Sequence, residues 1–372
     1  MCSKITNKYV LLKNCAGKMV EERGIVGISA AYLAGIATMA AAEPATGILY
    51  AGGPAGLAAT LMSLLPFCRK AAGSVTVYAA FFFLGIFTFC SRELCGAIVW
   101  QRPEAAQTAF ELLKAAIADS GLDNGALVTA LLTGDRSGLS AVTTRAFREA
   151  GAAHILALSG LHLGIIYGLL KKMTCWTGRS RISEIAASLA AIAAAGFYVM
   201  VTGCGASVMR AFLFICLNET ARLCPSRRRS PMSIYAAALT IQLTLDASVI
   251  RSTGFQLSYL AMLGIYLVFP RLDAWYPGSG KNPLKRIWSA SALTISCQVF
   301  TAPLVWWRFG SFPVYFLITN LVALPLTEAL IICSALSTTA AAAGLCPPPL
   351  IHLTDLLSEA LLGFLEAVAS IS

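Results

Sequence analysis

Charged residues are scarce in this chain of 372 residues: Asp, Glu, Lys and Arg make up 12% of it, against 57% hydrophobic residues. Soluble globular domains carry roughly 25% charged residues. A water-soluble fold of this composition would lack the polar side chains that cover a surface. The sequence therefore predicts an all-α, polytopic transmembrane protein, because a helix satisfies its own backbone hydrogen bonds within lipid.

Metal-binding patterns are also missing. The chain has 12 Cys but no CxxC pair, and most of its cysteines lie in apolar runs, where they act as small packing residues. It has three histidines, His154, His162 and His352, and no HxHxDH run. We therefore expect no metal site and no cofactor. A disulfide between Cys90 and Cys95, which flank an expected outer loop, is left open by the sequence.

Long apolar runs are abundant instead. About ten are long enough to span a bilayer, for which about 20 residues suffice, and they cover residues 25–42, 46–66, 74–91, 152–170, 182–201, 206–221, 232–247, 255–270, 287–307 and 312–345. The last run is too long for one span. Pro325 is expected to divide it, which would give about 10–11 spans in all.

The basic residues, which give the chain a net charge of +10, follow these spans. Lys and Arg cluster before the first expected span and after the second, fourth, sixth and eighth. These positions share one side of the membrane if the spans alternate, and the positive-inside rule makes that side, with the N-terminus, cytoplasmic. After the spans of residues 1–95, the segment 96–150 then lies outside as amphipathic helices. A further amphipathic helix is expected at 346–372.

Polar side chains concentrate in residues 131–168. The first half of this run carries Asp135, Arg136 and Arg145, and the apolar stretch after it still holds His154. Polar groups in a segment that faces hydrocarbon tend to face a cavity or a functional site. This run is therefore the first candidate for a functional surface.

The run GLHLGIIYG places Gly160, Gly164 and Gly168 four residues apart. This spacing predicts a smooth helix face for close packing against another helix. Ser159 and His162 are three residues apart and share a neighbouring face. Because a histidine can activate a serine as a nucleophile, an intramembrane serine hydrolase is an alternative interpretation.

Other spans contain polar groups as well. Gly203 and Gly205 are expected to break a helix before Arg210, and broken helices line cavities in channels and transporters. A secondary transporter for a small anionic solute, using Arg210, is a second alternative, although no repeat is visible. The remaining polar candidates within spans are Gln256, Ser258 and Asn320.

Four patches of the chain, in this order, resemble the signature of the ComEC competence family: GDRSGL with RAFREAGAAHILALSGLHLG, then TGCGASVMRA, DASVIRSTGFQLSYLAMLGI and TAPLVWWRFGSFPVYFLITNLVALP. The resemblance covers residues 124–345 as a channel domain. The second patch departs from the family pattern, because Cys204–Ser207 stand where relatives usually carry a Ser-Pro or Ser-Ser type run. Arg210 itself aligns.

The resemblance implies a bacterial inner-membrane channel that moves single-stranded DNA into the cytoplasm during natural transformation, rather than an enzyme. The implied partners are single-stranded DNA, membrane lipid, an external DNA receptor, a separate nuclease, and a cytoplasmic ATPase or single-strand-binding proteins. Two domains that many relatives have are not expected in this sequence. They are an OB-type domain between Phe89 and Asp135 and a metallo-β-lactamase-like nuclease domain. The DNA path is expected to draw on Asp135, Arg136, Arg145, His154, Ser159, Gly160, His162, Gly164, Arg210, Gln256, Ser258 and Asn320.

Overall fold

The computed structural model describes residues 24–42, 46–64, 74–95, 101–174, 181–223, 230–278, 282–310, 314–345 and 347–371. Within these ranges the regular structure is helical, and no strand occurs in them. This confirms the all-α fold that the composition predicted.

Six of the described helices are long and apolar enough to cross a membrane: Gly24–Ala42, Val77–Cys95, Arg181–Val201, Thr253–Ala274, Pro283–Phe309 and Phe316–Ala342. The chain is therefore a multi-pass membrane protein, with fewer such helices than the ten expected runs. The run 152–170 is interrupted between two helices, α8 (Ala153–Leu156) and α9 (Gly160–Thr174). The run 232–247 forms the shorter helix α12 (Pro231–Leu245).

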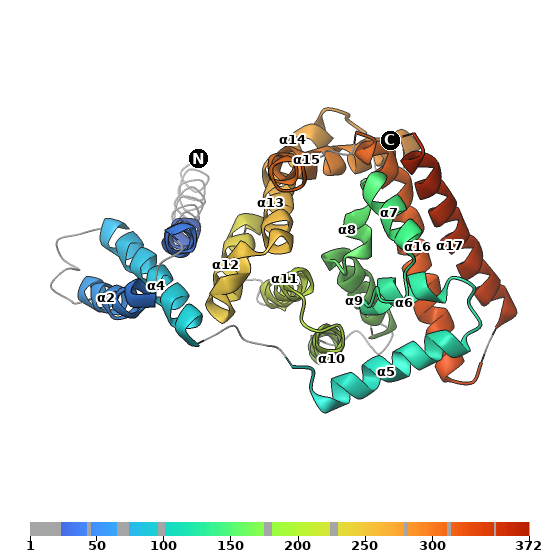
Figure 1. Ribbon diagram of the computed structural model, residues 1–372, viewed down its shortest axis with the longest axis horizontal. Coiled ribbons are helices and arrows are strands. Elements are labelled where there is room, and N and C mark those ends of the chain that lie inside the picture. The colour runs from blue at the N-terminus through green and yellow to red at the C-terminus, as the bar shows by residue number, and fades with distance from the viewer. Residues whose placement is uncertain are drawn as a thin grey trace, which may run out of the picture. The chain divides into compact units, whose positions relative to one another are not determined.

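The chain forms two compact units (Figure 1). Unit 1 comprises Met1–Val99 and Leu217–Gln256, and unit 2 comprises Trp100–Cys216 and Leu257–Ser372. Helices α11 (Ala206–Leu223) and α13 (Thr253–Leu267) each run from one unit into the other. Besides parts of these two, unit 1 contains the helix of residues 24–42, α2 (Thr46–Leu64), α4 (Ser74–Cys95), α12 and the 3-10 helix η3 (Ala247–Arg251).

Glycines allow the helices of unit 1 to come into backbone contact. A Cβ placed on Gly35 would lie 2.0 Å from the carbonyl oxygen of Phe82, and one on Gly85 would lie 2.3 Å from that of Tyr32. On the α2 side, a Cβ on Gly56 would lie 2.8 Å from the oxygen of Phe83. Helix α4 therefore packs closely against both the helix of residues 24–42 and α2, as small residues allow in membrane proteins.

The two cysteines of α4 are not joined. Cys90 is buried beside α2, with its sulfur 3.1 Å from the position of a Cβ on Gly52, and Cys95 is exposed. Both are free thiols. The disulfide that the sequence left open is therefore absent.

Polar contacts at one end of unit 1 join the C-terminal end of α4 to η3 and to the C-terminal end of α12. Arg251 of η3 pairs with Glu93 of α4 across 3.0 Å (Nη1 to Oε1), and Arg92 donates to the carbonyl oxygen of Thr244 at 3.3 Å. The C-terminal ends of α4 and α12 thus lie together. Alternating spans also put these two ends on the same side of the membrane.

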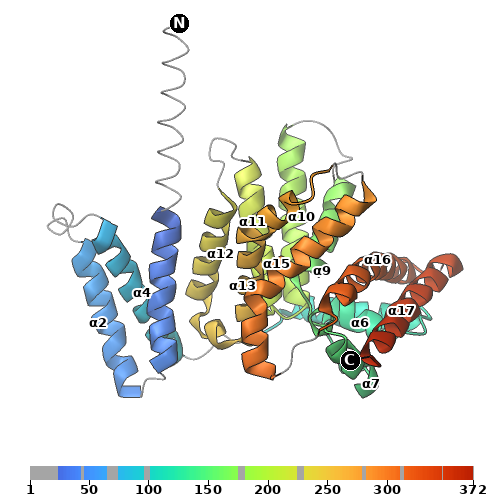
Figure 2. The ribbon, with the colours of Figure 1, turned by 90° about the horizontal axis from the view of Figure 1, so that it is seen from above.

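Unit 2 holds the remaining helices: α5 (Glu104–Asp119), α6 (Gly125–Thr133), α7 (Ala141–Glu149), α8, α9, α10 (Arg181–Val201), α14 (Phe269–Ala274), α15 (Pro283–Phe309), α16 (Phe316–Ala342) and α17 (Pro348–Ala369). Figure 2 shows α16 and α17 beside α6 and α7, toward one end of the upright α10. One hydrophobic core joins α5, α6, α7, α8, α16 and α17, with members from Ile117, Leu131 and Phe147 to Ile331 and Leu361.

The helices of segment 96–150 differ in character. Helices α5 and α7 bury residues such as Phe110 and Phe147 and expose polar side chains such as Glu111 and Arg145. Helix α6 is instead a core helix, since six of its nine residues are buried. This segment is therefore packed into unit 2 rather than lying loosely over it.

Helix α16 runs without a break through Pro325, so the expected division of residues 312–345 into two spans is wrong. A proline is tolerated inside a membrane helix because neighbouring groups satisfy the freed backbone carbonyl. Its buried face carries small hydroxyl side chains such as Thr327 and Ser334, while Ile318 and Leu336 are exposed. Apolar side chains outward and hydroxyls inward are typical of a membrane helix.

The turn between α10 and α11 lies beside the start of α5. Val201 belongs to a small core with Phe110, and a Cβ on Gly203 would lie 3.3 Å from Nη2 of Arg102. The hydroxyl of Tyr198 donates to the carbonyl oxygen of Leu132 at 2.6 Å. The C-terminal end of α10 and the turn after it thus lie beside α5 and α6.

Candidate functional site

Ser159 and His162 together cap the N-terminal end of α9. The Ser159 Oγ accepts a hydrogen bond from the backbone N–H of Leu161 at 3.3 Å. In return, Nδ1 of His162 accepts the backbone N–H of Ser159 at 3.3 Å and lies 3.0 Å from its Oγ. This is a reciprocal capping arrangement with histidine in the position where Glu or Gln is usual. The proximity of the two side chains is therefore accounted for by helix capping.

The capping role gives the serine a testable signature. Ser159→Ala is expected to lower the stability of the fold by about 0.5–2 kcal/mol, the usual loss for a removed N-cap, while the DNA transport that the family resemblance of the sequence implies should continue. A serine hydrolase predicts the opposite, because the nucleophilic oxygen would be gone. Thermal unfolding and DNA uptake, measured on the same variant, separate the two. Uptake abolished at near-normal stability would restore the hydrolase interpretation.

The glycines of α9 do not act alike. A Cβ on Gly160 would lie 3.1 Å from the Cβ of Ala211 and 3.6 Å from Nη2 of Arg210, both on α11. Gly164 and Gly168 are exposed, with no heavy atom within 4 Å of a Cβ placed on either. The predicted helix-packing ridge is therefore wrong for these two glycines, which lie on an open face of α9. Only the first glycine makes a close helix contact.

Arg210 connects three helices of unit 2. It is 8% exposed, and its Nη2 donates to Oγ of Ser207, one turn earlier on α11, at 3.4 Å. The Ser207 Oγ lies 3.2 Å from that of Ser258 on α13. The guanidinium carbon of Arg210 lies 5.9 Å from the centre of the Tyr259 ring, within the range of a cation–π interaction.

Three sequence-predicted residues therefore meet in one place: Gly160, Arg210 and Ser258. They come from three separate patches of the chain and from helices α9, α11 and α13. An arginine side chain carries a positive charge, and the N-terminal end of a helix carries about half a unit of positive charge. The positive potentials of Arg210 and of the start of α9 thus lie close together.

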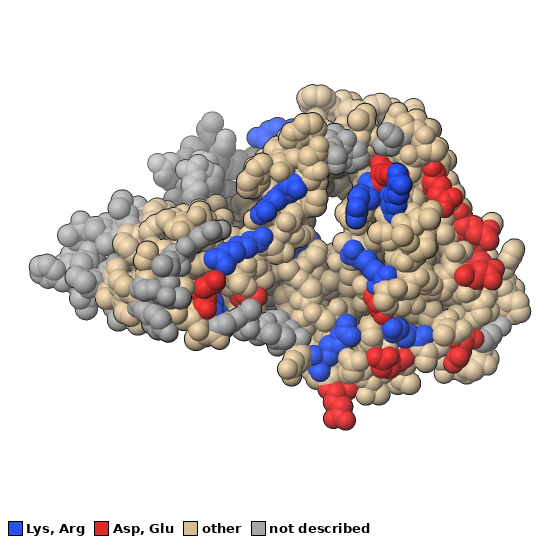
Figure 3. Space-filling model, viewed as in Figure 1, with Lys and Arg blue, Asp and Glu red and all other residues tan. Residues whose placement is uncertain are grey.

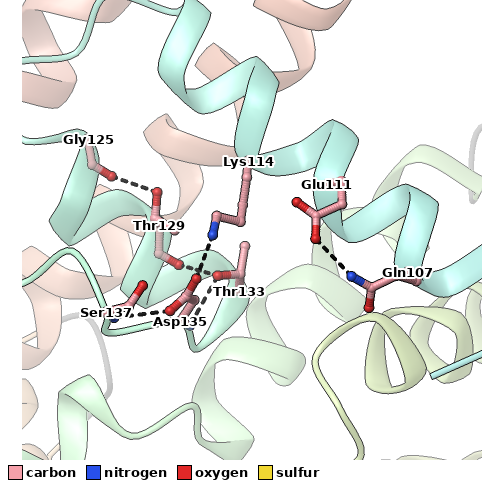
Figure 4. A network of polar contacts seen from close by, with 8 residues as sticks. All are labelled: Gln107, Glu111, Lys114, Gly125, Thr129, Thr133, Asp135 and Ser137. Atoms are coloured by element: carbon pink, nitrogen blue, oxygen red, sulfur yellow. Dashed lines mark hydrogen bonds and ion pairs between the residues drawn. The ribbon is translucent and has the colours of Figure 1, made fainter. Parts of the chain in front are cut away.

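Asp135 has a different environment. Its Oδ2 pairs with Nζ of Lys114 at 2.7 Å, and its Oδ1 accepts the backbone N–H of Ser137 at 3.0 Å (Figure 4). The ammonium of Lys114, followed by the bonds from Ser137, holds the pKa of Asp135 well below its usual range. A depressed carboxyl pKa stabilises the fold above the ordinary Asp range and loses that effect as pH falls through the lowered value. The contact is therefore fully made at neutral pH.

The other predicted residues are dispersed. Arg136 and His154 are exposed, and the exposed Arg145 pairs with Glu149 at 2.7 Å. Asn320 is buried in α16. Gln256 belongs to unit 1, where its Nε2 donates to the carbonyl oxygen of Ile250 at 2.7 Å.

Figure 3 shows where charge gathers on one face of unit 2. Lys and Arg side chains lie over α7, beside an opening bordered by α7 and α8 on one side and by α13 and α15 on the other. Asp and Glu side chains are concentrated along the outer edge, near α17. Basic side chains thus lie beside the opening, with an acidic one among them, and further acidic side chains lie along the outer edge.

The sequence pointed to neither Lys114 nor Ser207. Ser207 lies three residues before Arg210 on the same helix, so helical spacing could have indicated it. Lys114 is 21 residues from Asp135, and no local pattern links the two. Within the described part of the chain, no group of three or more His, Cys, Asp or Glu side chains could hold a metal ion.

Fold and site define a multi-pass α-helical membrane protein with a buried arginine, Arg210, beside the N-terminal end of α9. A model of the competence protein family matches residues 131–372, and the chain belongs to this family. The match confirms the resemblance seen in the sequence.

The chain is similar to the ComE operon protein 3 of Bacillus subtilis (strain 168), with 27% identity over 207 residues that cover 55% of this chain and 25% of that protein. It is also similar to the competence protein ComA of Neisseria gonorrhoeae, with 28% identity over 217 residues, 56% of this chain and 29% of that protein. The chain thus spans little more than a quarter of either relative. No solved structure matches it.

Proposed function

We propose that this chain is the conducting core of an inner-membrane channel that moves single-stranded DNA into the cytoplasm during natural transformation. Membership of the competence family supports a role in DNA uptake. The observation that carries the proposal is the meeting of Arg210 with the N-terminal end of α9. Both present positive charge, and every nucleotide of a strand presents one negative phosphate.

The chemistry of this place suits a strand of any sequence. Arginine and helix N-termini bind phosphate groups without reading bases. The open face of α9 at Gly164 and Gly168 offers the strand a surface without side chains. The basic side chains beside the opening in Figure 3 would draw DNA toward it.

The proposal includes the orientation with a cytoplasmic N-terminus, which the basic loops favour. In that orientation, residues 101–150 and the adjacent turn before α11 would meet incoming DNA. An external DNA receptor, a separate nuclease and a cytoplasmic ATPase or single-strand-binding protein would complete the pathway. Membrane lipid around the spans is the remaining proposed partner.

A planar lipid bilayer containing the purified protein tests the channel, because an applied voltage supplies the driving force. We expect an ionic conductance that added single-stranded DNA interrupts in transient blockades, with the strand recovered on the far side. A small-solute transporter would instead give no conductance and would carry inorganic phosphate in a liposome flux assay. These two results together would contradict the channel and support the secondary transporter.

A further inference from the structure

We propose that Arg136 binds a phosphate group of the incoming strand and that Asp135 and Lys114 position it without touching DNA. The proposal rests on the proposed function and assigns separate roles to neighbours in the run GDRSG. The recognised chemistry is the phosphodiester backbone, which an arginine binds with two parallel N–H groups.

The turn that carries Arg136 is fixed at its start by α6. Gly134 ends this helix in the left-handed conformation, with φ 81°, which glycine adopts at no steric cost. The Thr133 hydroxyl donates to the carbonyl oxygen of Thr129 at 2.7 Å and accepts the backbone N–H of Asp135 at 3.1 Å. Since α6 is a core helix, this end of the turn cannot shift independently.

The turn is fixed at its far end as well. The backbone N–H of Leu139 donates to the carbonyl oxygen of Arg136 at 3.1 Å. Ser140 then caps α7, with its Oγ accepting the backbone N–H of Thr143 at 2.9 Å. The backbone of residue 136 is therefore held between two helices, and the residue itself is exposed.

Asp135 and Lys114 tie the middle of the turn to α5. Figure 4 shows the two oxygens of Asp135 directed to different partners, Lys114 on α5 and the backbone of Ser137 within the turn. The bond from Ser137 closes a local turn around Arg136. Both carboxylate oxygens are thus occupied by bonds that shape the backbone.

The charge balance leaves Arg136 available for a ligand. Asp135 is compensated by Lys114, and Arg145 is compensated by Glu149. Arg136 is exposed and has no ion-pair partner among the residues that the structure describes. A fixed backbone reduces the entropy lost when such a side chain binds. A phosphate contact is the use that this arrangement favours.

Binding of a fluorescent single-stranded oligonucleotide to the full chain in detergent, followed by anisotropy at several salt concentrations, tests the assignment. Arg136→Ala should weaken binding about three- to tenfold and reduce the slope of log affinity against log salt by about 0.7, the value for one phosphate contact on a single strand. Arg136→Lys should keep the slope. Arg181→Ala, which removes an exposed arginine at the start of α10, is the control and should change neither quantity.

Asp135→Asn distinguishes a positioning effect of Asp135 on Arg136 from a direct effect of its negative charge on DNA binding. Removing a negative charge near DNA would by itself strengthen binding. If Asp135 positions Arg136, the variant should instead weaken binding, and it should have no further effect in an Arg136→Ala background. Lys114→Met breaks the same ion pair with the opposite change of charge and should weaken binding too. Unfolding temperatures of all variants show whether a loss reflects the fold.

The outcomes are distinct. Unchanged affinity and salt slope in Arg136→Ala, with the unaltered chain binding DNA, would overturn this inference alone. Stronger binding by Asp135→Asn would overturn the positioning role. No binding of DNA by the unaltered chain would overturn the proposed function itself.

Discussion

Arg210→Glu is expected to lower DNA transport at least about 100-fold while the protein still folds and inserts. Two unit charges 4 Å apart interact by about 4 kcal/mol near a protein surface, so reversing the charge turns an attraction for each phosphate into a repulsion of similar size. About 1.4 kcal/mol corresponds to a tenfold change in rate. The fold should survive because a carboxylate is favourable near the N-terminal end of a helix, here that of α9.

The measurement is the rate of strand passage through the bilayer channel, together with the folded yield of each variant. Arg210→Lys keeps the charge but loses the planar group, so it should retain a substantial part of the rate. Arg181→Glu is the matched control, since it reverses an exposed charge at the start of α10. Normal passage in a folded Arg210→Glu protein would show that Arg210 is not on the DNA path.

Gly264→Leu is expected to destabilise the fold much more than Gly164→Leu does. A Cβ on Gly264 would lie 2.1 Å from the carbonyl oxygen of Ser296 and 3.2 Å from Cδ2 of Phe300, so α13 and α15 would have to separate. Overpacking of a close contact costs about 1–3 kcal/mol, and more where the backbone itself must move. We expect a loss of at least about 3 kcal/mol or failure to fold.

Gly164→Leu makes the same chemical change at an open position. With nothing within 4 Å of its Cβ, its stability should stay within about 0.5 kcal/mol of the unaltered protein. Thermal unfolding in detergent measures both variants. If the open face of α9 borders the strand, Gly164→Leu should slow transport without changing stability. A large loss of stability in this variant would show that a helix packs on Gly164 after all.

The fold class followed from the sequence, because it depends on a summed property, the composition. A chain with 12% charged residues cannot cover a soluble surface. The basic loops predict which chain ends share a side of the membrane, and that topology stays a prediction. The family resemblance was likewise carried by contiguous residues.

Part of the candidate site also followed from the sequence. Gly160, Arg210 and Ser258 were each singled out, and the structure brings them together. What the sequence lacked was the partner of each residue. Lys114 and Asp135 meet although 21 residues separate them, and Ser207 meets Ser258 across 51 residues. Such pairs depend on how whole helices pack, which local spacing does not encode.

The glycines show most clearly what the sequence determined and what only the tertiary structure decided. Spacing alone made Gly160, Gly164 and Gly168 equivalent, yet only the first touches another helix. Gly264 lies within the third resembling patch, where nothing singled it out, and it makes one of the closest backbone contacts of unit 2. The sequence by itself determined that α9 has a smooth face. Only the tertiary structure decided where a neighbour lies on that face, because a missing side chain permits close approach but exerts no force that brings a partner there.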